Sequence, residues 1–471
     1  MKQPYPFQQR AIDLGTERNM FLADSCGLGK KLMCLEVAHR IQTSLRLPTL
    51  IVSIKQDVWQ WEREVKLQYP DTDITIGTVD PIVVPEIPDW WLILHYEALV
   101  RHSKALSRIK FGTIVLDEAH HIKSPHAQRS KASKKLRSFR KIVATGTPIN
   151  RSPVDLWSPL EFLYPEKWAG KLGAFREEHE RYFFDTAGFR RVIPGAKDPA
   201  ALGAILAPFY LARTKDEVAP DLPPNIIKEQ VFQLTGAQAS LYRRIQHSQD
   251  IEVPLFDLGN SPTPLLQHPA ARFIGGDGLE LEQMEGIVPD PNATLYIPSK
   301  MVQMLREQQC ALDPELLGSN ASSVKLDWVR EWREANPEEP TIIFTNYRSV
   351  AQRLARDFDA HLVMGGIKLP KEWSKPTIVA TLGAGSTALD LGHLRTAIFL
   401  DTHWSSIKMD QALNRIHRLS NKYPVQTIYC VAAGTIDELF LESFQNNWDQ
   451  YTLIRNHAQR FQLARGQQIR S

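Results

Sequence analysis

Two stretches of the chain alternate short apolar runs with segments whose apolar residues recur at helical spacing. In the first stretch the apolar runs predict buried strands at Asn19–Ala23, Thr49–Ser53, Trp91–His95, Thr113–Leu116 and Lys141–Ala144. The same pattern returns late, with strands predicted at Thr341–Thr345, Thr377–Ala380, Thr396–Leu400 and Thr427–Val431, and helices such as Ser349–Phe358 and Lys408–Leu419. Strand–helix alternation is typical of a parallel sheet with helices on both faces, so we expect two α/β units, one toward each end.

The middle of the chain has a different pattern. Residues 160–225 are predicted to be helical, with apolar bulk supplied by Trp168, Phe175, Tyr182, Phe183 and Phe184. Residues 249–298 are rich in Pro and Gly and carry a run of acids, which predicts an irregular surface insertion. The expected domains are 1–160 for the first lobe, 161–248 for a helical protrusion and inter-lobe segment, 249–298 for the insertion, 299–445 for the second lobe and 446–471 for a basic tail.

The basic tail carries arginines and no acid after Asp449. Its arginines are Arg455, Arg460, Arg465 and Arg470. They could contact phosphates, although a solvated helix end is the favoured interpretation.

The composition argues against several classes of protein. The net charge is only +3, so nucleic-acid binding would need local basic faces. The four cysteines form no CxxC pair, which argues against a zinc ribbon or a disulfide framework and fits a reduced, cytoplasmic compartment. No signal core and no run of about 18 apolar residues is present, so no contact with a membrane is expected.

A glycine loop follows the first predicted strand and opens a helix. In Gly27-Leu28-Gly29-Lys30 the glycines would let the backbone wrap around phosphate oxygens, and the helix N-terminus would add free N–H groups. Lys30 would bridge the terminal phosphates. An ordinary helix-entry turn with a surface lysine is the alternative.

A pair of acids closes another predicted strand, within Asp117-Glu118-Ala119-His120. This places both carboxylates at the sheet edge where α/β proteins bind ligands. Asp117 would hold magnesium, directly or through water, and Glu118 would orient and deprotonate the attacking water. A solvated strand end would explain one acid but not the whole tetrapeptide.

Two arginines in the second unit, Arg415 and Arg418, are three residues apart and are expected to share one helical face. Their planar groups suit phosphate oxygens and would stabilise charge on a transferring phosphate. Alone, such a pair is most often a solvated face. In combination with the two sites above, and with Gln8 placed where an adenine-reading amide would sit, it indicates an ATP-driven motor.

These motifs resemble those of helicase superfamily two, and within it the Swi/Snf-type DNA translocases with a DEAH box and two RecA-like lobes. The segments that carry the resemblance are Pro6-Phe7-Gln8, Leu22 to Lys30, Ile51 to Glu62, Val115 to Lys123, Thr145 to Asn150, Arg213-Thr214-Lys215, Leu222-Pro223-Pro224, Ile343-Phe344, Gly385 to Leu391 and Gln411 to Arg418. Together they cover about residues 4–240 and 300–440.

The resemblance implies a set of site residues for ATP, Mg²⁺ and nucleic acid. It implies that Lys30, Asp117, Glu118, Arg415 and Arg418 are catalytic. The implied nucleotide contacts are Gln8, Cys26, Gly27, Leu28, Gly29, Lys30, Lys31, Gly385 and Gln411. The implied contacts with the nucleic-acid backbone, most simply that of duplex DNA, are Ser53, Lys55, Thr145, Gly146 and Arg348.

The chain departs from the family pattern at one position above all. Lys31 stands where the family has a Thr or Ser hydroxyl that ligates magnesium, and an ammonium group has no acceptor lone pair. Magnesium could still bind through phosphates, Asp117 and water; Lys31 could turn to solvent and leave a weaker ATPase; or its charge could replace that of the metal, leaving binding without turnover. Retention of Glu118 and both arginines favours hydrolysis.

Three functions follow. The first is a DNA-stimulated ATPase that moves along duplex DNA. The second is a nucleotide-gated DNA-binding protein with little or no turnover. The third is the motor subunit of a restriction, defence or repair assembly that a protein partner targets. The sequence does not determine the oligomeric state.

Overall fold

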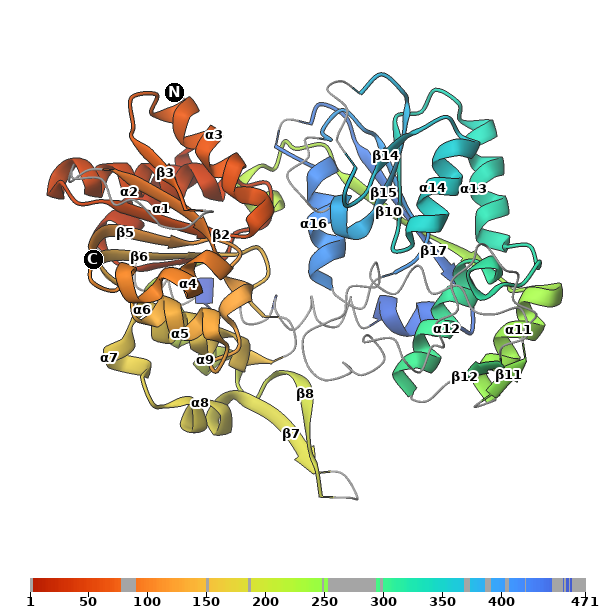
Figure 1. Cartoon of the computed structure of the whole chain (residues 1–471), viewed down its shortest axis with the longest axis horizontal. Helices are drawn as coiled ribbons and strands as arrows, with labels where there is room; N and C mark the ends of the chain where they lie inside the picture. Colours follow the sequence, from red (N-terminus) through yellow and green to blue (C-terminus); the bar gives the residue numbers. More distant parts are fainter. Residues whose placement is uncertain are drawn as a thin grey trace. The chain divides into compact units, whose positions relative to one another are not determined.

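The structure is a computed structural model that describes residues 3–77, 90–149, 152–184, 188–247, 250–252, 294–296, 300–367, 373–385, 391–402, 406–419 and 421–442, and residues 452, 455, 456, 458 and 459. The chain forms two compact units (Figure 1). Unit 1 comprises Met1–Leu222 with Gln445–Ser471, and unit 2 comprises Pro223–Phe444. The domain boundaries expected within these units stay predictions.

Unit 1 is built on a parallel sheet. In spatial order its described strands are β3 (Ile74–Ile76), β4 (Trp91–His95), β2 (Thr49–Ser53), β5 (Lys110–Leu116), β6 (Arg137–Ala144), β1 (Met20–Leu22) and β9 (Tyr210–Leu211). Each neighbouring pair runs parallel. Parallel strands bring their carboxyl ends to one edge, so the residues after β1, β2 and β5 lie close together.

Helices cover both faces of this sheet, because successive strand residues point to opposite sides. One core contains Met20 and Leu22 and packs on α1 (Pro6–Glu17), α2 (Lys30–Leu45) and α3 (Val58–Gln68). The other contains Phe21 and is covered by α4 (Tyr96–Leu106), α5 (Gln128–Lys134), α6 (Trp157–Leu163), α8 (Leu172–His179) and α9 (Pro199–Leu206). Short helices α7 (Pro165–Trp168) and α10 (Lys215–Val218) complete the unit.

Unit 2 repeats this plan. Its parallel sheet has the order β10 (Asn225–Phe232), β17 (Val425–Ala432), β16 (Thr396–Phe399), β13 (Thr341–Thr345), β15 (Thr377–Thr381) and β14 (His361–Val363). One face packs on α15 (Leu382–Gly385) and α16 (Ser406–Ile416), and the other on α13 (Val324–Ala335) and α14 (Arg348–Asp357). Helices α11 (Gly236–His247) and α12 (Lys300–Leu312) pack together beside the sheet. The prediction of two α/β units with parallel sheets is confirmed.

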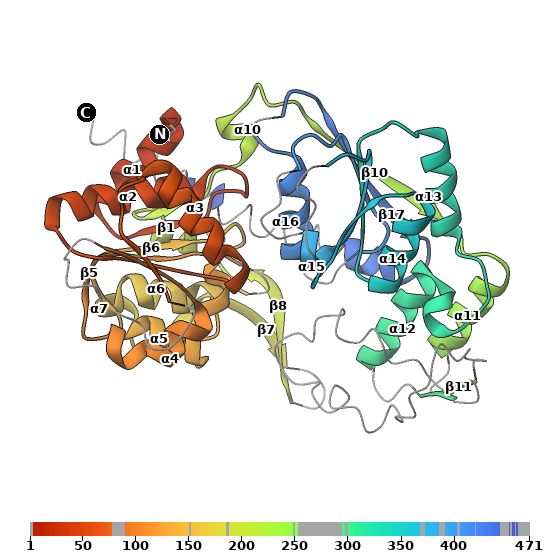
Figure 2. The ribbon, with the colours of Figure 1, turned by 45° about the horizontal axis from the view of Figure 1, so that its top comes forward.

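The expectation of a helical segment over 160–225 is wrong in its middle. Residues Glu180–Phe184 (β7) pair antiparallel with Arg190–Ala196 (β8), and this hairpin projects from the rest of unit 1 (Figures 1 and 2). The aromatic run Tyr182 to Phe184, which helical spacing could also accommodate, has the high strand propensity that favours the observed pairing.

Two further expectations need correction. Short strands β11 (Asp250–Glu252) and β12 (Thr294–Tyr296) pair antiparallel, so these parts of the stretch expected to be irregular are ordered; the residues between them lie outside the described residues.

Arg455 is not a solvated helix end. It is 8% exposed and its Nη2 lies 3.5 Å from a carboxylate oxygen of Glu217. The other tail arginines fall outside the described part of the chain. None of the described helices is long and apolar enough to cross a lipid bilayer.

Candidate functional site

The glycine loop lies between β1 and α2, at the carboxyl edge of the sheet in unit 1. Gly27 and Gly29 both have left-handed backbone conformations, with φ of 88° and 77°. A Cβ atom on Gly29 would lie 2.4 Å from Nε2 of Gln8, so only glycine fits there. Helix α2 begins at Lys30, directly after this turn. The exposed N–H groups and dipole of a 16-residue helix therefore point at a loop shaped to receive an anion.

Gln8 supports this loop through both atoms of its amide. Its Nε2 donates to the carbonyl of Leu28 at 2.9 Å, and its Oε1 accepts from the backbone N–H of Tyr5 at 2.9 Å. The side chain is 3% exposed. Each of these bonds uses one of the two donors or one of the two lone pairs of the amide, and reading of an adenine ring by Gln8 stays a prediction.

Lys30 folds back over the loop. Its Nζ donates to the carbonyls of Asp24 at 2.7 Å and Ser25 at 3.2 Å. Burial acts to lower the pKa of Lys30, but electrostatic interactions with Cys26 and Glu118, and with Asp24 and Asp117, outweigh it and raise the pKa. Lys30 is therefore a permanent cation at the centre of an acidic edge.

Arg213 fixes the start of the loop. Its backbone N–H and its Nε donate to Oδ1 of Asp24 at 2.9 and 3.0 Å, and its guanidinium also reaches Oδ2 of Asp24 and the carbonyl of Phe7. Asp24 is fully buried, so this ion pair fixes the loop to the segment between β9 and α10. The sequence placed Arg213 in a family segment but did not predict this role.

The acidic pair follows β5. Both oxygens of Asp117 accept hydrogen bonds: Oδ2 accepts from Trp61 Nε1 at 2.8 Å and from Ser53 Oγ at 3.2 Å, and Oδ1 accepts from the backbone N–H of Glu118 at 3.0 Å. Burial, and then the charge of Glu118, raises the pKa of Asp117 to about 6. The hydroxyl of Tyr96 holds the Asp117 carbonyl at 2.7 Å. Asp117 is thus fixed in one orientation before any ligand binds.

Glu118 adopts a left-handed conformation, with φ 48° and ψ 50°, which is unfavourable for a residue with a Cβ. Its Oε2 lies 3.2 Å from Nδ1 of His120. Burial, and then His120 and Arg129, lower the pKa of the neighbouring His121 to about 3, so His121 is neutral. Strained non-glycine residues concentrate at functional sites, and the strain here turns one carboxylate of the pair away from the strand.

The residues predicted to contact DNA occupy different environments. Ser53 is buried and its hydroxyl is bonded to Asp117, and Thr145 is also buried. Gly146 packs on the loop, since a Cβ there would lie 2.4 Å from Sγ of Cys26. Lys55 is exposed. In unit 2, Arg348 begins α14 and donates to the carbonyl of Gly365 at 3.0 Å. Contact with nucleic acid stays a prediction for all five.

Lys31 turns to neither the loop nor open solvent. Its Nζ donates to Oε1 of Gln60 and forms an ion pair with Oδ2 of Asp57 at 3.3 Å. The ammonium group lies 5.5 Å from the ring centroid of Trp61. Its side chain is 22% exposed. Of the three outcomes open from the sequence, the one in which Lys31 swings into solvent is therefore wrong for this structure.

The residues present do not fit a magnesium ion held by two protein oxygens. Asp117 supplies one carboxylate, but both of its oxygens already accept hydrogen bonds, and Lys31 supplies a cation in place of the second oxygen. Among the residues that the structure describes, no group of three His, Cys, Asp or Glu side chains could hold a metal ion. Ligation of a metal by Asp117 stays a prediction.

In unit 2, the expected shared face of Arg415 and Arg418 is wrong. Helix α16 ends at Ile416, where the side chain of Asn421 donates to the Ile416 carbonyl at 2.9 Å and also accepts from the N–H of Arg418. Arg418 lies beyond the helix and donates from Nε to the carbonyl of Arg415 at 3.1 Å. Gln411 lies on α16 and Gly385 ends α15, so their nucleotide contacts stay predictions.

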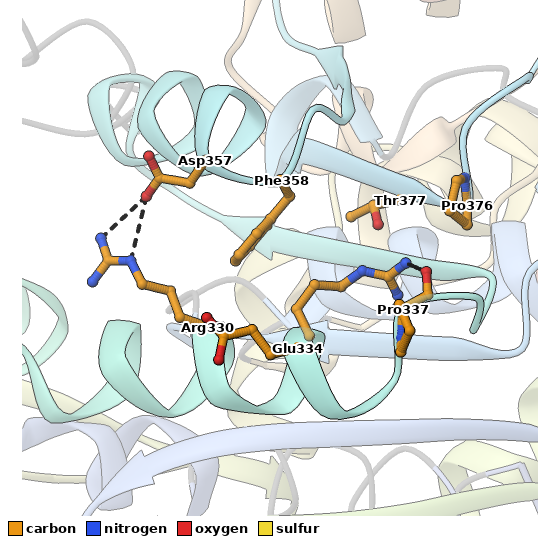
Figure 3. A pocket seen from close by; sticks show the side chains of 8 residues that line it. Arg330, Glu334, Pro337, Asp357, Phe358, Pro376 and Thr377 are labelled. Atoms are coloured by element: carbon orange, nitrogen blue, oxygen red, sulfur yellow. Dashed lines mark hydrogen bonds and ion pairs between the residues drawn. The ribbon is translucent and has the colours of Figure 1, made fainter.

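A pocket of about 510 Å³ opens elsewhere on unit 2, and its chemistry does not suit a nucleotide (Figure 3). Its arginines are already bonded: Arg330 to Asp357 at 3.2 Å, and Arg333 to backbone carbonyls at 2.7 and 2.9 Å. It lies at Thr377, where β15 begins, whereas open parallel sheets bind ligands at the carboxyl ends of their strands.

Known proteins resemble the chain over most of its length. It is 28% identical over 474 residues to YwqA, a proposed ATP-dependent helicase/translocase of Bacillus subtilis, covering 92% of this chain and 46% of YwqA. It is 25% identical to the TATA-binding protein-associated factor MOT1 of Saccharomyces cerevisiae and 26% identical to the human DNA repair and recombination protein RAD54B, covering 90% and 88% of this chain. The chain spans only 26% of MOT1 and 50% of RAD54B.

A solved structure of a Sulfolobus solfataricus SWI2/SNF2 ATPase core in complex with dsDNA is 22% identical, with a TM-score of 0.44, and covers 97% of each chain. The family model of the SNF2-related domain matches residues 10–260, which is more than half of the chain. The chain therefore belongs to the SNF2-related domain family.

Proposed function

We propose that this protein is an ATP-dependent DNA translocase that hydrolyses ATP at the carboxyl edge of unit 1. The observation that carries the proposal is the position of Lys30, after β1, and of Asp117 and Glu118, after β5, at the carboxyl edge of one parallel sheet, beside a loop with two glycines in left-handed conformations. The names of relatives support the choice of substrates, since MG018 of Mycoplasma genitalium is named as an uncharacterized ATP-dependent helicase and RAD54B as a DNA repair and recombination protein.

The chain's own residues supply distinct parts of this reaction. The loop and the N-terminus of α2 bind the phosphates, and Lys30 exchanges its two carbonyl partners for the terminal phosphate oxygens. Glu118 accepts a proton from the attacking water. The role predicted for Arg415 and Arg418 of unit 2, stabilisation of charge on a phosphate, stays a prediction. Magnesium, common to ATPases of this kind, stays a prediction, and none of these roles depends on it.

DNA contacts would be made to the phosphate backbone, so binding should be nearly independent of sequence and sensitive to salt. Lys55, which is exposed, and Arg348, which is half-buried, are the proposed contacts. A protein partner that targets the motor is also proposed, because the relative MOT1 is named as a TATA-binding protein-associated factor.

The observation at Lys31 favours a second candidate function, a nucleotide-gated DNA-binding protein with little turnover. A fixed cation where the family has a hydroxyl could hold the nucleotide without promoting its cleavage.

Phosphate release by the purified chain separates the two candidates. It is measured without nucleic acid and with duplex DNA, single-stranded DNA or RNA, beside Glu118→Gln and the exposed control Glu166→Gln. The translocase predicts release that duplex DNA stimulates, a loss of at least about 100-fold in Glu118→Gln, and no loss in Glu166→Gln. Release no greater than that of Glu118→Gln under every condition would contradict hydrolysis and favour the nucleotide-gated protein.

A further inference from the structure

Lys31 lies in the first turn of α2, immediately after the lysine of the phosphate loop, yet three groups from one neighbouring segment hold its ammonium. Asp57 ends the short 3₁₀ turn Lys55–Asp57, and Gln60 and Trp61 lie in the first turns of α3. The ammonium bonds to the first two and lies over the ring of the third. A flexible four-carbon side chain loses much rotamer freedom in such a setting, so an accidental surface orientation would not show three partners.

The burial of Asp57 indicates that its ion pair with Lys31 is part of the fold. Its side chain is only 7% exposed, and its Oδ1 is buried without a hydrogen-bond partner among the described residues. A carboxylate removed from water needs a counter-charge, and the ion pair with Lys31 is the one that the structure provides. Each charged group therefore holds the other in place.

Trp61 connects this pair to the acidic edge. Its indole Nε1 donates to Oδ2 of Asp117, while its ring lies beneath the ammonium of Lys31. The positive charge of Lys31 reaches Asp117, since it lowers the pKa of that carboxyl against the opposing effects of burial and Glu118. The carboxylate that would face a metal ion is thus already partly balanced by a cation of the protein.

We propose that Lys31, tethered by Asp57 and Gln60, is a resident cation that stands in for the metal at this edge and lets the chain bind ATP almost independently of divalent metal ions. The inference rests on the proposed nucleotide site. It deepens that proposal, because it names Lys31 as the residue that replaces the metal ion when ATP binds. The ammonium has three donors and uses one on Gln60 and one on Asp57, so a phosphate oxygen can approach it without breaking the tether.

Equilibrium binding of a fluorescent ATP analogue tests this, measured once in magnesium and once in EDTA. The full chain is compared with Lys31→Thr, which restores the hydroxyl of the family pattern, and with the exposed control Lys104→Thr. We expect replacement of magnesium by EDTA to change the Kd of the unmodified chain and of Lys104→Thr by less than about threefold, and to weaken binding by Lys31→Thr by at least about tenfold. Circular dichroism confirms that each variant is folded.

Equal metal dependence of the unmodified chain and Lys31→Thr would overturn the role of Lys31 while leaving the nucleotide site intact. A loss of affinity of at least about tenfold for the unmodified chain in EDTA would do the same. Absence of analogue binding in both solutions would contradict the proposed nucleotide site itself, and the inference with it. Because the readout is binding, these outcomes stay distinct from any effect of Lys31→Thr on hydrolysis.

Discussion

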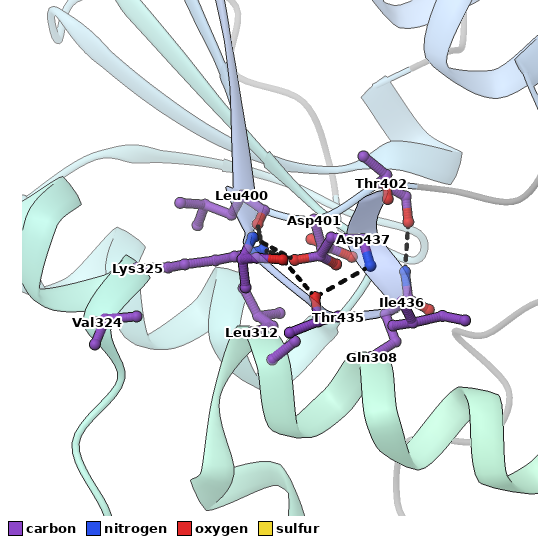
Figure 4. A network of polar contacts seen from close by, with 12 residues as sticks. Gln308, Leu312, Val324, Lys325, Leu400, Asp401, Thr402, Thr435, Ile436 and Asp437 are labelled. Carbon is purple, nitrogen blue, oxygen red and sulfur yellow. Dashed lines mark hydrogen bonds and ion pairs between the residues drawn. The ribbon is translucent and has the colours of Figure 1, made fainter. Parts of the chain in front are cut away.

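Two lysines, one in each unit, form ion pairs with buried aspartates, and the two lysines differ in how much of the side chain stays exposed. Lys325 in unit 2 is fully buried, and its Nζ donates to Asp437 at 2.6 Å and to the Leu400 carbonyl at 2.9 Å (Figure 4). Lys31 in unit 1 pairs with Asp57 but keeps 22% of its side chain exposed, at the edge that carries the phosphate loop.

The comparison shows how the same chemistry serves either the fold or a ligand. Lys325 joins α13 to the end of β16 and to Asp437, so its charge is committed to packing within unit 2. Lys31 is held in one place by Gln60 and Asp57 but is only partly buried. Burial, more than the ion pair itself, separates a structural lysine from one available to a substrate.

Removal of Lys325 should have the largest effect. Lys325→Met leaves Asp437 buried without its cation, so we expect the free energy of unfolding to fall by about 3–5 kcal/mol in urea denaturation. The control is Lys375→Met, which breaks an ion pair with Asp359 whose carboxylate is 91% exposed, and should cost less than about 1 kcal/mol. Equal losses for the two variants would contradict the structural role of Lys325.

Glu118 should show the opposite behaviour, a loss of activity without a loss of stability. Asparagine tolerates the left-handed conformation better than glutamate, so Glu118→Asn should stabilise the chain by up to about 1 kcal/mol while hydrolysis falls at least about 100-fold. Thermal unfolding and phosphate release are measured on the same samples.

The matched control is Arg46→Asn, another left-handed position, exposed at the end of α2. It should gain similar stability and keep full activity. A destabilised Glu118→Asn variant would show that relief of the backbone strain at residue 118 does not stabilise the fold. It would contradict the idea that this strain is the cost of placing a catalytic carboxylate.

Asp401 should make unit 2 more stable as the pH falls. Burial raises its pKa to about 6, against the bonds from Thr345 and Asn346 and the charge of Lys325, whereas an unfolded aspartate titrates near about 4. The folded protein therefore takes up a proton first, and stability rises between about pH 6 and pH 4 by roughly 3 kcal/mol. Asp401→Asn should remove this component from urea denaturation at a series of pH values. An unchanged slope would contradict the raised pKa.

The smallest effect is expected on the β7–β8 hairpin. Phe184 is 64% exposed, so Phe184→Ser should change the free energy of unfolding by less than about 0.5 kcal/mol. The buried aromatic Phe175, 2% exposed, is the contrast, and Phe175→Ala should cost about 3–5 kcal/mol in the same denaturation experiment. A large loss in Phe184→Ser would mean that the hairpin packs more closely than its exposure shows.

The sequence predicted strands best where they are buried on both faces. The bounds of β2, β4 and β13 agree with the expected apolar runs. Strand β9 has only two residues, and β10 is an edge strand with exposed isoleucines and a mixed pattern, so neither produces a continuous apolar run.

The sequence predicted only those parts of the candidate site whose residues are close together in the chain. The phosphate loop and the acidic pair are contiguous motifs, and the structure brings them to one edge. The tether of Lys31 joins residues 26 and 29 positions apart, and the lock of Asp24 by Arg213 spans 189 positions. No periodicity links such residues, because their proximity follows from strand order and not from local spacing.

The central claim, that the edge of unit 1 binds the phosphates of ATP, is tested most directly by calorimetric titration of the chain and of Lys30→Ala with ATP. Lys30 is the cation placed over the loop, so its removal should weaken binding at least about tenfold, whereas the exposed control Lys104→Ala should bind as the unmodified chain does. Equal affinity of Lys30→Ala and the unmodified chain, or no binding by either, would contradict the account.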